Sequence, residues 1–150
     1  MIVVTGASGQ LGRLVIEELL KTQAASSIVA AVRNPAKVAD LAARGVVVRQ
    51  ADYSQPSTLA SAFAGAEKLL LISSSEVGQR AAQHRAAIDA ARQAGVKLLA
   101  YTSVLHADRS QLGLAVEHRE TEAMLGASGV PYFLLNDTAT TEIYTAAIGA

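Results

Sequence analysis

Three glycines follow the first apolar run with a spacing that suits phosphate binding. The stretch "VVTGASGQLGRLV" places Gly6, Gly9 and Gly12 between a predicted strand and a predicted helix. In such a loop the first glycine permits a tight turn, and the second lets the backbone approach a pyrophosphate. The third allows close packing of helix on strand. The pattern predicts a dinucleotide site at a helix N-terminus, and the alternative is a glycine-rich turn without a ligand.

The end of the second predicted strand indicates which dinucleotide is bound. An NAD site usually carries an acidic residue there for the ribose 2′-hydroxyl, whereas "AAVRNP" presents Arg33. A guanidinium can bind phosphate oxygens through two parallel hydrogen bonds, and Lys37 adds charge one turn later. The sequence therefore favours NADPH over NADH, unless Arg33 is an ordinary surface arginine at a strand end.

Further polar residues follow the later strands, at the edge of the sheet where ligands of this architecture bind. Asp52 is placed to accept a hydrogen bond from an adenine amino group and Tyr53 to lie against the ring, although this pair equally suits a helix cap. Hydroxyl groups after the fourth and fifth strands are weaker candidates, because serines are also ordinary loop residues. These candidates are Ser73, Ser74, Ser75, Tyr101 and Thr102.

Candidates for catalysis are few. Short-chain reductases usually place a Lys four residues after the Tyr that donates a proton. No tyrosine here has that partner: the residues four positions after Tyr53, Tyr101, Tyr132 and Tyr144 are Ser57, Leu105, Asn136 and Ile148. His106 follows the fifth strand and could face a cofactor, or be a loop residue without a role. His84 and His118 stand among charged residues in predicted helices and are interpreted as solvated.

Apolar runs and amphipathic stretches alternate along the chain, which predicts a parallel sheet covered by helices on both faces. Right-handed crossovers then favour a doubly wound α/β fold that ends after about six strands. From Leu11 the predicted first helix turns Leu14, Val15 and Leu19 towards the core. The six predicted strands are 2–5, 27–33, 46–50, 68–73, 97–103 and 130–135. The helices predicted after the first are 35–45, 56–65, 77–95 and 111–125.

The amino-acid composition of the chain limits which partners and which location we expect for the protein. The chain has 150 residues, enough for one domain, with 13 basic and 13 acidic residues that cancel. This balance argues against nucleic acid or an anionic membrane as a partner. Cysteine is absent, which excludes disulfides and thiol catalysis, and no apolar run approaches the roughly 20 residues of a membrane span. The N-terminal "MIVVTG" has no basic segment before it, so we expect a cytoplasmic protein.

Several stretches together resemble one family. They are "MIVVTGASGQLG", "IVAAVRNPAK", "VRQADYSQP", "EKLLLISSSEVGQR", "AGVKLLAYTSVLHAD" and "PYFLL". The resemblance, over residues 1–135, is to the bacterial NAD(P)H:quinone oxidoreductase type 2 group. That group belongs to the atypical short-chain dehydrogenases that look like the fungal regulator NmrA, and triarylmethane-dye reductases are similar.

The resemblance implies an NADPH-dependent reductase of a small quinone-like substrate, with NADH less suited as the cofactor. Members of the group lack the Tyr and Lys pair, so hydride transfer from a well-positioned nicotinamide would suffice. Other electrophiles, such as a dye, and a non-catalytic NADP(H)-sensing role remain alternatives. The implied site has Arg33 at the 2′-phosphate, Ser73, Ser74 and Ser75 near the nicotinamide side, and a phosphate loop of Gly6, Ser8, Gly9, Gln10, Leu11 and Gly12.

The resemblance stops between Leu135 and Asn136. The family continues with an Arg-Asn-Gly-aromatic-Tyr segment and a substrate lobe, whereas this chain reads "NDTATTEIYT" and has five more residues. We therefore expect residues 1–135 to form an NAD(P)-binding domain and 136–150 to be a tail outside the family. A sheet that ends at its sixth strand leaves an open edge, so we also expect self-association.

The Thr-rich run has a second explanation at the level of DNA. The common sequencing flow-cell adapter AATGATACGGCGACCACCGAGATCTACAC, translated in frame, gives the residues from Asn136 to Tyr144 and begins a codon that suits Thr145. Divergent loops rich in Thr and Asn also occur at protein surfaces, so a natural loop is the alternative.

We predict that source DNA prepared without this adapter encodes a different continuation after Leu135. The measurement is a sequence read across the codons for residues 130–150. The codons before Asn136 are the internal control, because they should be unchanged. Adapter-free DNA that encodes the same residues in the same frame would contradict the hypothesis.

Overall fold

The computed structural model describes residues 1–74, 76, 78–102, 113–135 and 148–149. Within them one sheet is formed by the strands β1 (Ile2–Thr5), β2 (Ile28–Val32), β3 (Val47–Gln50), β4 (Lys68–Leu71), β5 (Leu98–Thr102) and β6 (Tyr132–Leu135). All neighbouring strands are parallel, in the order β3-β2-β1-β4-β5-β6. The predicted doubly wound parallel sheet is therefore confirmed.

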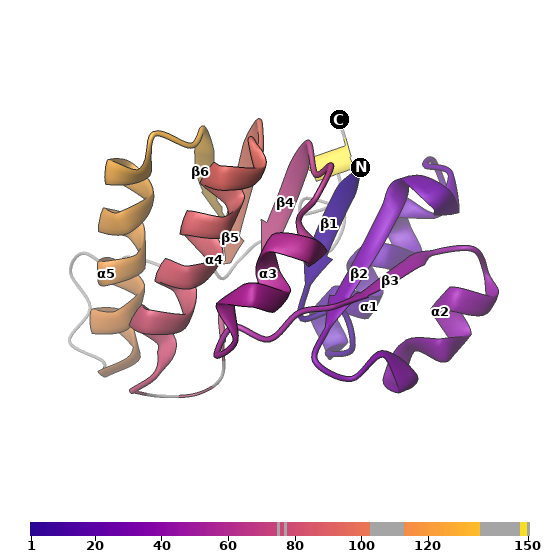
Figure 1. The fold of residues 1–150 in the computed structure, drawn as a ribbon, viewed down its shortest axis with the longest axis horizontal. Helices are drawn as coiled ribbons and strands as arrows, with labels where there is room; N and C mark the ends of the chain where they lie inside the picture. Colours follow the sequence, from indigo (N-terminus) through magenta and orange to yellow (C-terminus); the bar gives the residue numbers. More distant parts are fainter. Residues whose placement is uncertain (75, 77, 103–112, 136–147, 150) are drawn as a thin grey trace.

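Helices cover both faces of this sheet, as Figure 1 shows, with α3, α4 and α5 in front of it and α1 behind it. The helices are α1 (Gln10–Leu19), α2 (Ala39–Ala43), α3 (Pro56–Ala62), α4 (Arg80–Ala94) and α5 (Gly113–Ser128), with short 3-10 helices at Ala25–Ser27 and Pro35–Val38. The single helix predicted for 35–45 is thus divided at Val38, whose φ of −123° is not helical.

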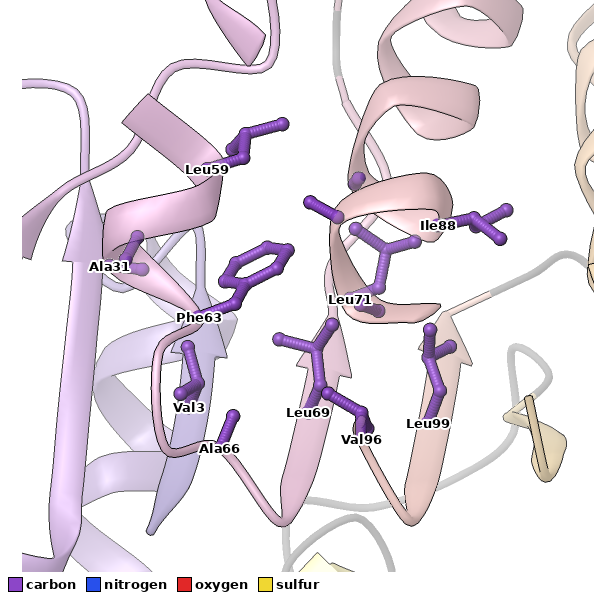
Figure 2. Packing of buried hydrophobic residues seen from close by; sticks show 14 of the residues in the cluster. Val3, Ala31, Leu59, Phe63, Ala66, Leu69, Leu71, Ile88, Val96 and Leu99 are labelled. Carbon is purple, nitrogen blue, oxygen red and sulfur yellow. The ribbon is translucent and has the colours of Figure 1, made fainter. Parts of the chain in front are cut away.

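The central strands are buried on both faces because their alternate side chains enter two different cores. On the side of α3 and α4, Val3 of β1 and Leu69 of β4 pack with Phe63 and Ile88 (Figure 2). On the side of α1, the intervening strand residues pack with Val15, Ile16 and Leu19, while the predicted core residue Leu14 is exposed. This double burial explains the continuous apolar runs of the strands.

Near the end of the chain the structure describes the last strand of the sheet, β6, and two residues of the tail, 148 and 149. Most of the tail, residues 136–147, lies outside the described residues, as does Ala150, so the predictions about them are untested there. Ile148 is buried against the α1 side of the sheet, and Gln23 Nε2 donates a hydrogen bond to the Gly149 carbonyl oxygen at 3.1 Å. In the described part of the chain β6 ends the sheet and exposes Tyr132 and Leu134, and self-association there stays a prediction.

None of the helices that the structure describes is both long and apolar enough to cross a membrane.

Side chains of α4 and α5 fasten the loop that joins β4 to α4. The Ser74 N–H donates to His84 Nε2 at 2.9 Å, and Arg80 Nε donates to the Ser74 carbonyl oxygen. From the neighbouring helix, Glu117 Oε1 accepts the Gly78 N–H at 2.6 Å. The loop that borders the carboxyl end of β4 is therefore held from two helices.

His84 and His118 are buried, so the prediction that they form solvated faces is wrong. His84 Nδ1 lies 2.8 Å from Thr121 Oγ1, and His118 Nδ1 lies 2.5 Å from the Tyr101 hydroxyl. Because His84 Nε2 accepts the Ser74 N–H, the proton of a neutral His84 ring belongs on Nδ1, where it is donated to Thr121. Both rings therefore serve as internal hydrogen-bonding groups.

We expect the stability of the fold to fall as the pH is lowered towards 4, partly because of His84. Burial, together with the charges of His118 and Arg80, lowers the pKa of His84 to about 4. Between the unfolded pKa of about 6.5 and this value, the unfolded chain binds a proton that the folded chain does not. The loss in the free energy of unfolding is at most about 3 kcal/mol, measured by urea unfolding across this pH range.

The matched variant is His84→Gln, whose amide oxygen can still accept the Ser74 N–H but does not titrate. It should be less stable than the wild type at pH 7 and show a shallower pH dependence. Burial also lowers the pKa of His118, which is present in both proteins, so its own titration contributes to both curves. The same slope in both proteins would show that His84 does not titrate on unfolding in this way.

Candidate cofactor-binding site

A cavity of about 250 Å³ lies at the carboxyl ends of β1, β2, β3 and β4. This is the edge of a doubly wound sheet where ligands bind. Its volume is below the roughly 300–1,000 Å³ of sites that enclose a drug-sized molecule, so it suits one part of a dinucleotide. The cavity is lined by Thr5, Gly6, Ser8, Gly9, Ala31, Val32, Arg33, Ala51, Asp52, Tyr53, Ile72, Ser73, Ser74, Glu76 and Gln83.

The glycine loop forms one wall of the cavity, and its geometry requires glycine. Gly6 has a φ of +59°, in the left-handed region that other residues rarely adopt. A Cβ atom at Gly12 would lie 2.4 Å from the Gly6 carbonyl oxygen, so any side chain there would displace α1 from the turn. The roles predicted for these two glycines, a tight turn and close helix packing, agree with this geometry.

The N-terminus of α1 supplies backbone donors beside the cavity. Gly9 precedes the helix, and no side chain caps this end. The first helical hydrogen bond is that of the Arg13 N–H with the Gly9 carbonyl oxygen at 3.0 Å, so the preceding N–H groups have no partner within the helix. Gln10, Leu11 and Gly12 carry these N–H groups; they directly follow Ser8 and Gly9, which line the cavity, but are not themselves among the lining residues. The arrangement suits an anion such as a phosphate.

Arg33 lines the cavity from the end of β2, as the sequence predicted, and its side chain is 71% exposed. Its Nη1 lies 3.2 Å from Glu76 Oε1, in an ion pair with the loop after β4. No pattern in the sequence indicates this partner. The arginine thus faces the cavity but is already paired with a carboxylate.

Asp52 and Tyr53 both line the cavity, and both make contacts that shape the chain after β3. Asp52 Oδ1 accepts the Ser54 N–H at 2.8 Å, a local turn that is compatible with either role predicted for it. The Tyr53 hydroxyl lies 2.6 Å from Thr5 Oγ1 and 2.9 Å from the Ile72 carbonyl oxygen. Burial raises the pKa of Tyr53 above its ordinary value, so its hydroxyl is a structural donor, and adenine contact remains a prediction.

The hydroxyl residues after β4 and β5 separate into two groups. Ser73 and Ser74 line the cavity, whereas Thr102 supports it from behind by accepting the Ser73 N–H at 2.8 Å. Tyr101 is fully buried in the core, where its hydroxyl meets His118, so its prediction as a cofactor contact is corrected. Ser75 and His106 lie outside the described residues.

Three polar residues of the site were missing from the sequence prediction. Thr5 is the last residue of β1, Glu76 follows the serines after β4, and Gln83 lies in the first turns of α4. Glu76 could have been recognised from its position near the carboxyl end of a strand. Gln83 could not, because only the folded loop brings its side chain to the cavity.

Comparisons with known proteins agree with this geometry. The chain is 63% identical to quinone oxidoreductase 2 of Escherichia coli (strain K12), over all of this chain and 52% of that protein. The crystal structure of an NADPH-dependent quinone oxidoreductase from Escherichia coli in complex with NADPH matches with a TM-score of 0.89 at 63% identity, over 98% of this chain and 52% of that one. Triphenylmethane reductase from Citrobacter sp. in complex with NADP(H) matches with a TM-score of 0.89 at 45% identity, over 96% and 51%.

The chain spans about half the length of these relatives. A family described as NAD(P)H-binding matches residues 6–146, which include the glycine loop and every residue that lines the cavity except Thr5. The match also runs past Leu135, as far as residue 146. On this match, the chain belongs to the NAD(P)H-binding family.

Proposed function

We propose that the cavity at the carboxyl ends of β1–β4 binds the adenosine and phosphate part of NADPH. The observation that carries this proposal is the glycine loop at the start of α1, which offers free N–H groups beside a cavity that Arg33 enters. A phosphate suits the helix N-terminus, and a second phosphate suits the guanidinium. The relatives of solved structure that are described as complexes with NADPH and NADP(H) support the same cofactor.

This chain spans about half the length of its relatives. We further propose that the whole protein reduces quinone-like substrates. Hydride transfer from the reduced nicotinamide is the chemistry that the cofactor supplies when bound. The residues that line the described cavity would bind and orient the cofactor through backbone N–H groups, hydroxyl groups and the Arg33 guanidinium. The higher identity to the quinone reductase, 63% against 45% for the dye reductase, favours a quinone.

These proposals place the protein in the cytoplasm, where NADPH is available. They also involve a small-molecule partner, in agreement with the quinone oxidoreductase relative. We also propose that the cofactor-binding unit ends at Leu135.

We expect Arg33→Ala to weaken NADPH binding roughly 10- to 100-fold, because a charge-assisted contact with the 2′-phosphate is lost. NADH lacks that phosphate and should lose less than about threefold. The measurement is a calorimetric or fluorescence titration of both cofactors. Arg44→Ala is the matched control, since Arg44 is also an exposed arginine in an ion pair, with Glu17, and does not line the cavity. Equal losses for NADPH and NADH would show that Arg33 does not recognise the 2′-phosphate.

We expect this chain alone to reduce quinones much more slowly than the Escherichia coli relative. The resemblance implies that the segment after Leu135 contacts the nicotinamide, and that segment differs here. The assay follows NADPH oxidation with a soluble benzoquinone, and a reaction without quinone is the control. Turnover close to that of the full-length relative would contradict the expectation.

A further inference from the structure

The ion pair between Arg33 and Glu76 crosses the candidate cofactor site. Arg33 follows β2 and Glu76 follows β4, and β1 lies between these two strands in the sheet. A contact of 3.2 Å between Arg33 Nη1 and Glu76 Oε1 therefore passes over the carboxyl end of β1, where the glycine loop begins. Both side chains line the same cavity. The pair thus stands where the 2′-phosphate of the proposed cofactor would meet Arg33.

Glu76 is held in this position by other residues of the site. Its second carboxylate oxygen, Oε2, accepts a hydrogen bond from Gln83 Nε2 at 2.8 Å, and its N–H donates to Ser74 Oγ at 3.2 Å. Gln83 is almost fully buried and is itself fixed, since its Nε2 also donates to Ser54 Oγ at 3.1 Å. The carboxylate is therefore placed by the fold, with one oxygen on Gln83 and the other on Arg33.

The charged side chains that line the cavity determine how the position of Glu76 affects a phosphate that approaches Arg33. Among the described lining residues Arg33 is the only one with a cationic side chain, while Asp52 and Glu76 carry carboxylates. A phosphate that approaches Arg33 meets a guanidinium that is already neutralised by a carboxylate within hydrogen-bonding distance. Two anions then share one cation, and each raises the free energy of the other.

From this arrangement we propose that Glu76 is a specificity-determining residue, which competes with the 2′-phosphate for Arg33 and so limits the preference for NADPH over NADH. This inference rests on the proposed function, because it requires that Arg33 binds the 2′-phosphate. A cofactor with a 2′-hydroxyl leaves the ion pair intact, whereas one with a 2′-phosphate must displace or share it. Removing the charge of Glu76 then favours only the phosphorylated ligand.

The test compares two small ligands that differ only in the group at the 2′ position, adenosine 2′,5′-bisphosphate and adenosine 5′-monophosphate. Their dissociation constants are measured by calorimetry for the wild type and for Glu76→Gln, whose amide oxygen can still accept from Gln83. The bisphosphate should bind roughly three- to fivefold more tightly to the variant, the upper part of the range expected for one exposed charge pair, and the monophosphate within about twofold of the wild type. The gain should shrink at high salt.

Glu17→Gln is the matched control. Glu17 also forms an ion pair with an arginine, Arg44, and its side chain is 47% exposed against 45% for Glu76, but it does not line the cavity. It should change neither dissociation constant. In the Arg33→Ala background, most of the gain from Glu76→Gln should disappear, because there is no guanidinium left to compete for.

The outcomes separate the two proposals. If neither the wild type nor Glu76→Gln binds the bisphosphate better than the monophosphate, Arg33 does not recognise the 2′-phosphate, and the proposed function fails together with the inference. If the wild type prefers the bisphosphate but Glu76→Gln leaves that preference unchanged or reduces it, only the inference is overturned. An equal gain for both ligands also overturns it, since Glu76 would then obstruct the adenosine part in general.

Discussion

The close contact between α1 and the turn before it is the constraint on which the site depends. A Cβ atom at Gly12 would lie 2.4 Å from the Gly6 carbonyl oxygen and 2.7 Å from Ala7 Cα, distances that no packed structure tolerates. Glycine at this position lets the helix begin directly above the end of β1. The backbone donors of the first helical turn, rather than side chains, are therefore presented to the cavity, and that is what an anion site requires.

The parallel sheet extends this arrangement to the neighbouring strands. Thr5 ends β1 with its hydroxyl buried, donating to the Leu70 carbonyl oxygen at 3.0 Å and accepting the Ile72 N–H at 2.9 Å and the Tyr53 hydroxyl at 2.6 Å. One hydroxyl thus joins the ends of β1 and β4 to the chain after β3. The loop beyond β4 is likewise held from α4 and α5, so hydrogen bonds, most of them partly buried, fix the floor and one side of the cavity.

Local signals in the sequence predicted the strands, the glycine loop and the position of Arg33, because each depends on near neighbours in the chain. The burial of His84 was missed, although Ala87, Ile88 and Ala91 follow it at helical spacing and share its face. The charged residues Arg85 and Asp89 near it suggested a solvated face, but these two are exposed while His84 is buried. The partner of Arg33 could not be predicted, since it depends on how a loop 43 residues away along the chain folds.

Packed residues determine the shape of this site, whereas two exposed side chains at its rim determine its charge. Thr5 is buried, Gly12 packs tightly against the turn before it, and hydrogen bonds to α4 and α5 hold the loop after β4, so changes at these contacts would disturb the fold. Arg33 and Glu76 are exposed at the rim, where an ion pair contributes little to stability because water screens it. Substitutions at these two positions can therefore change which anion the site accepts while the scaffold stays the same. On the proposed function, the balance of the exposed charges of Arg33 and Glu76 sets the cofactor preference of this domain, and the fold itself does not.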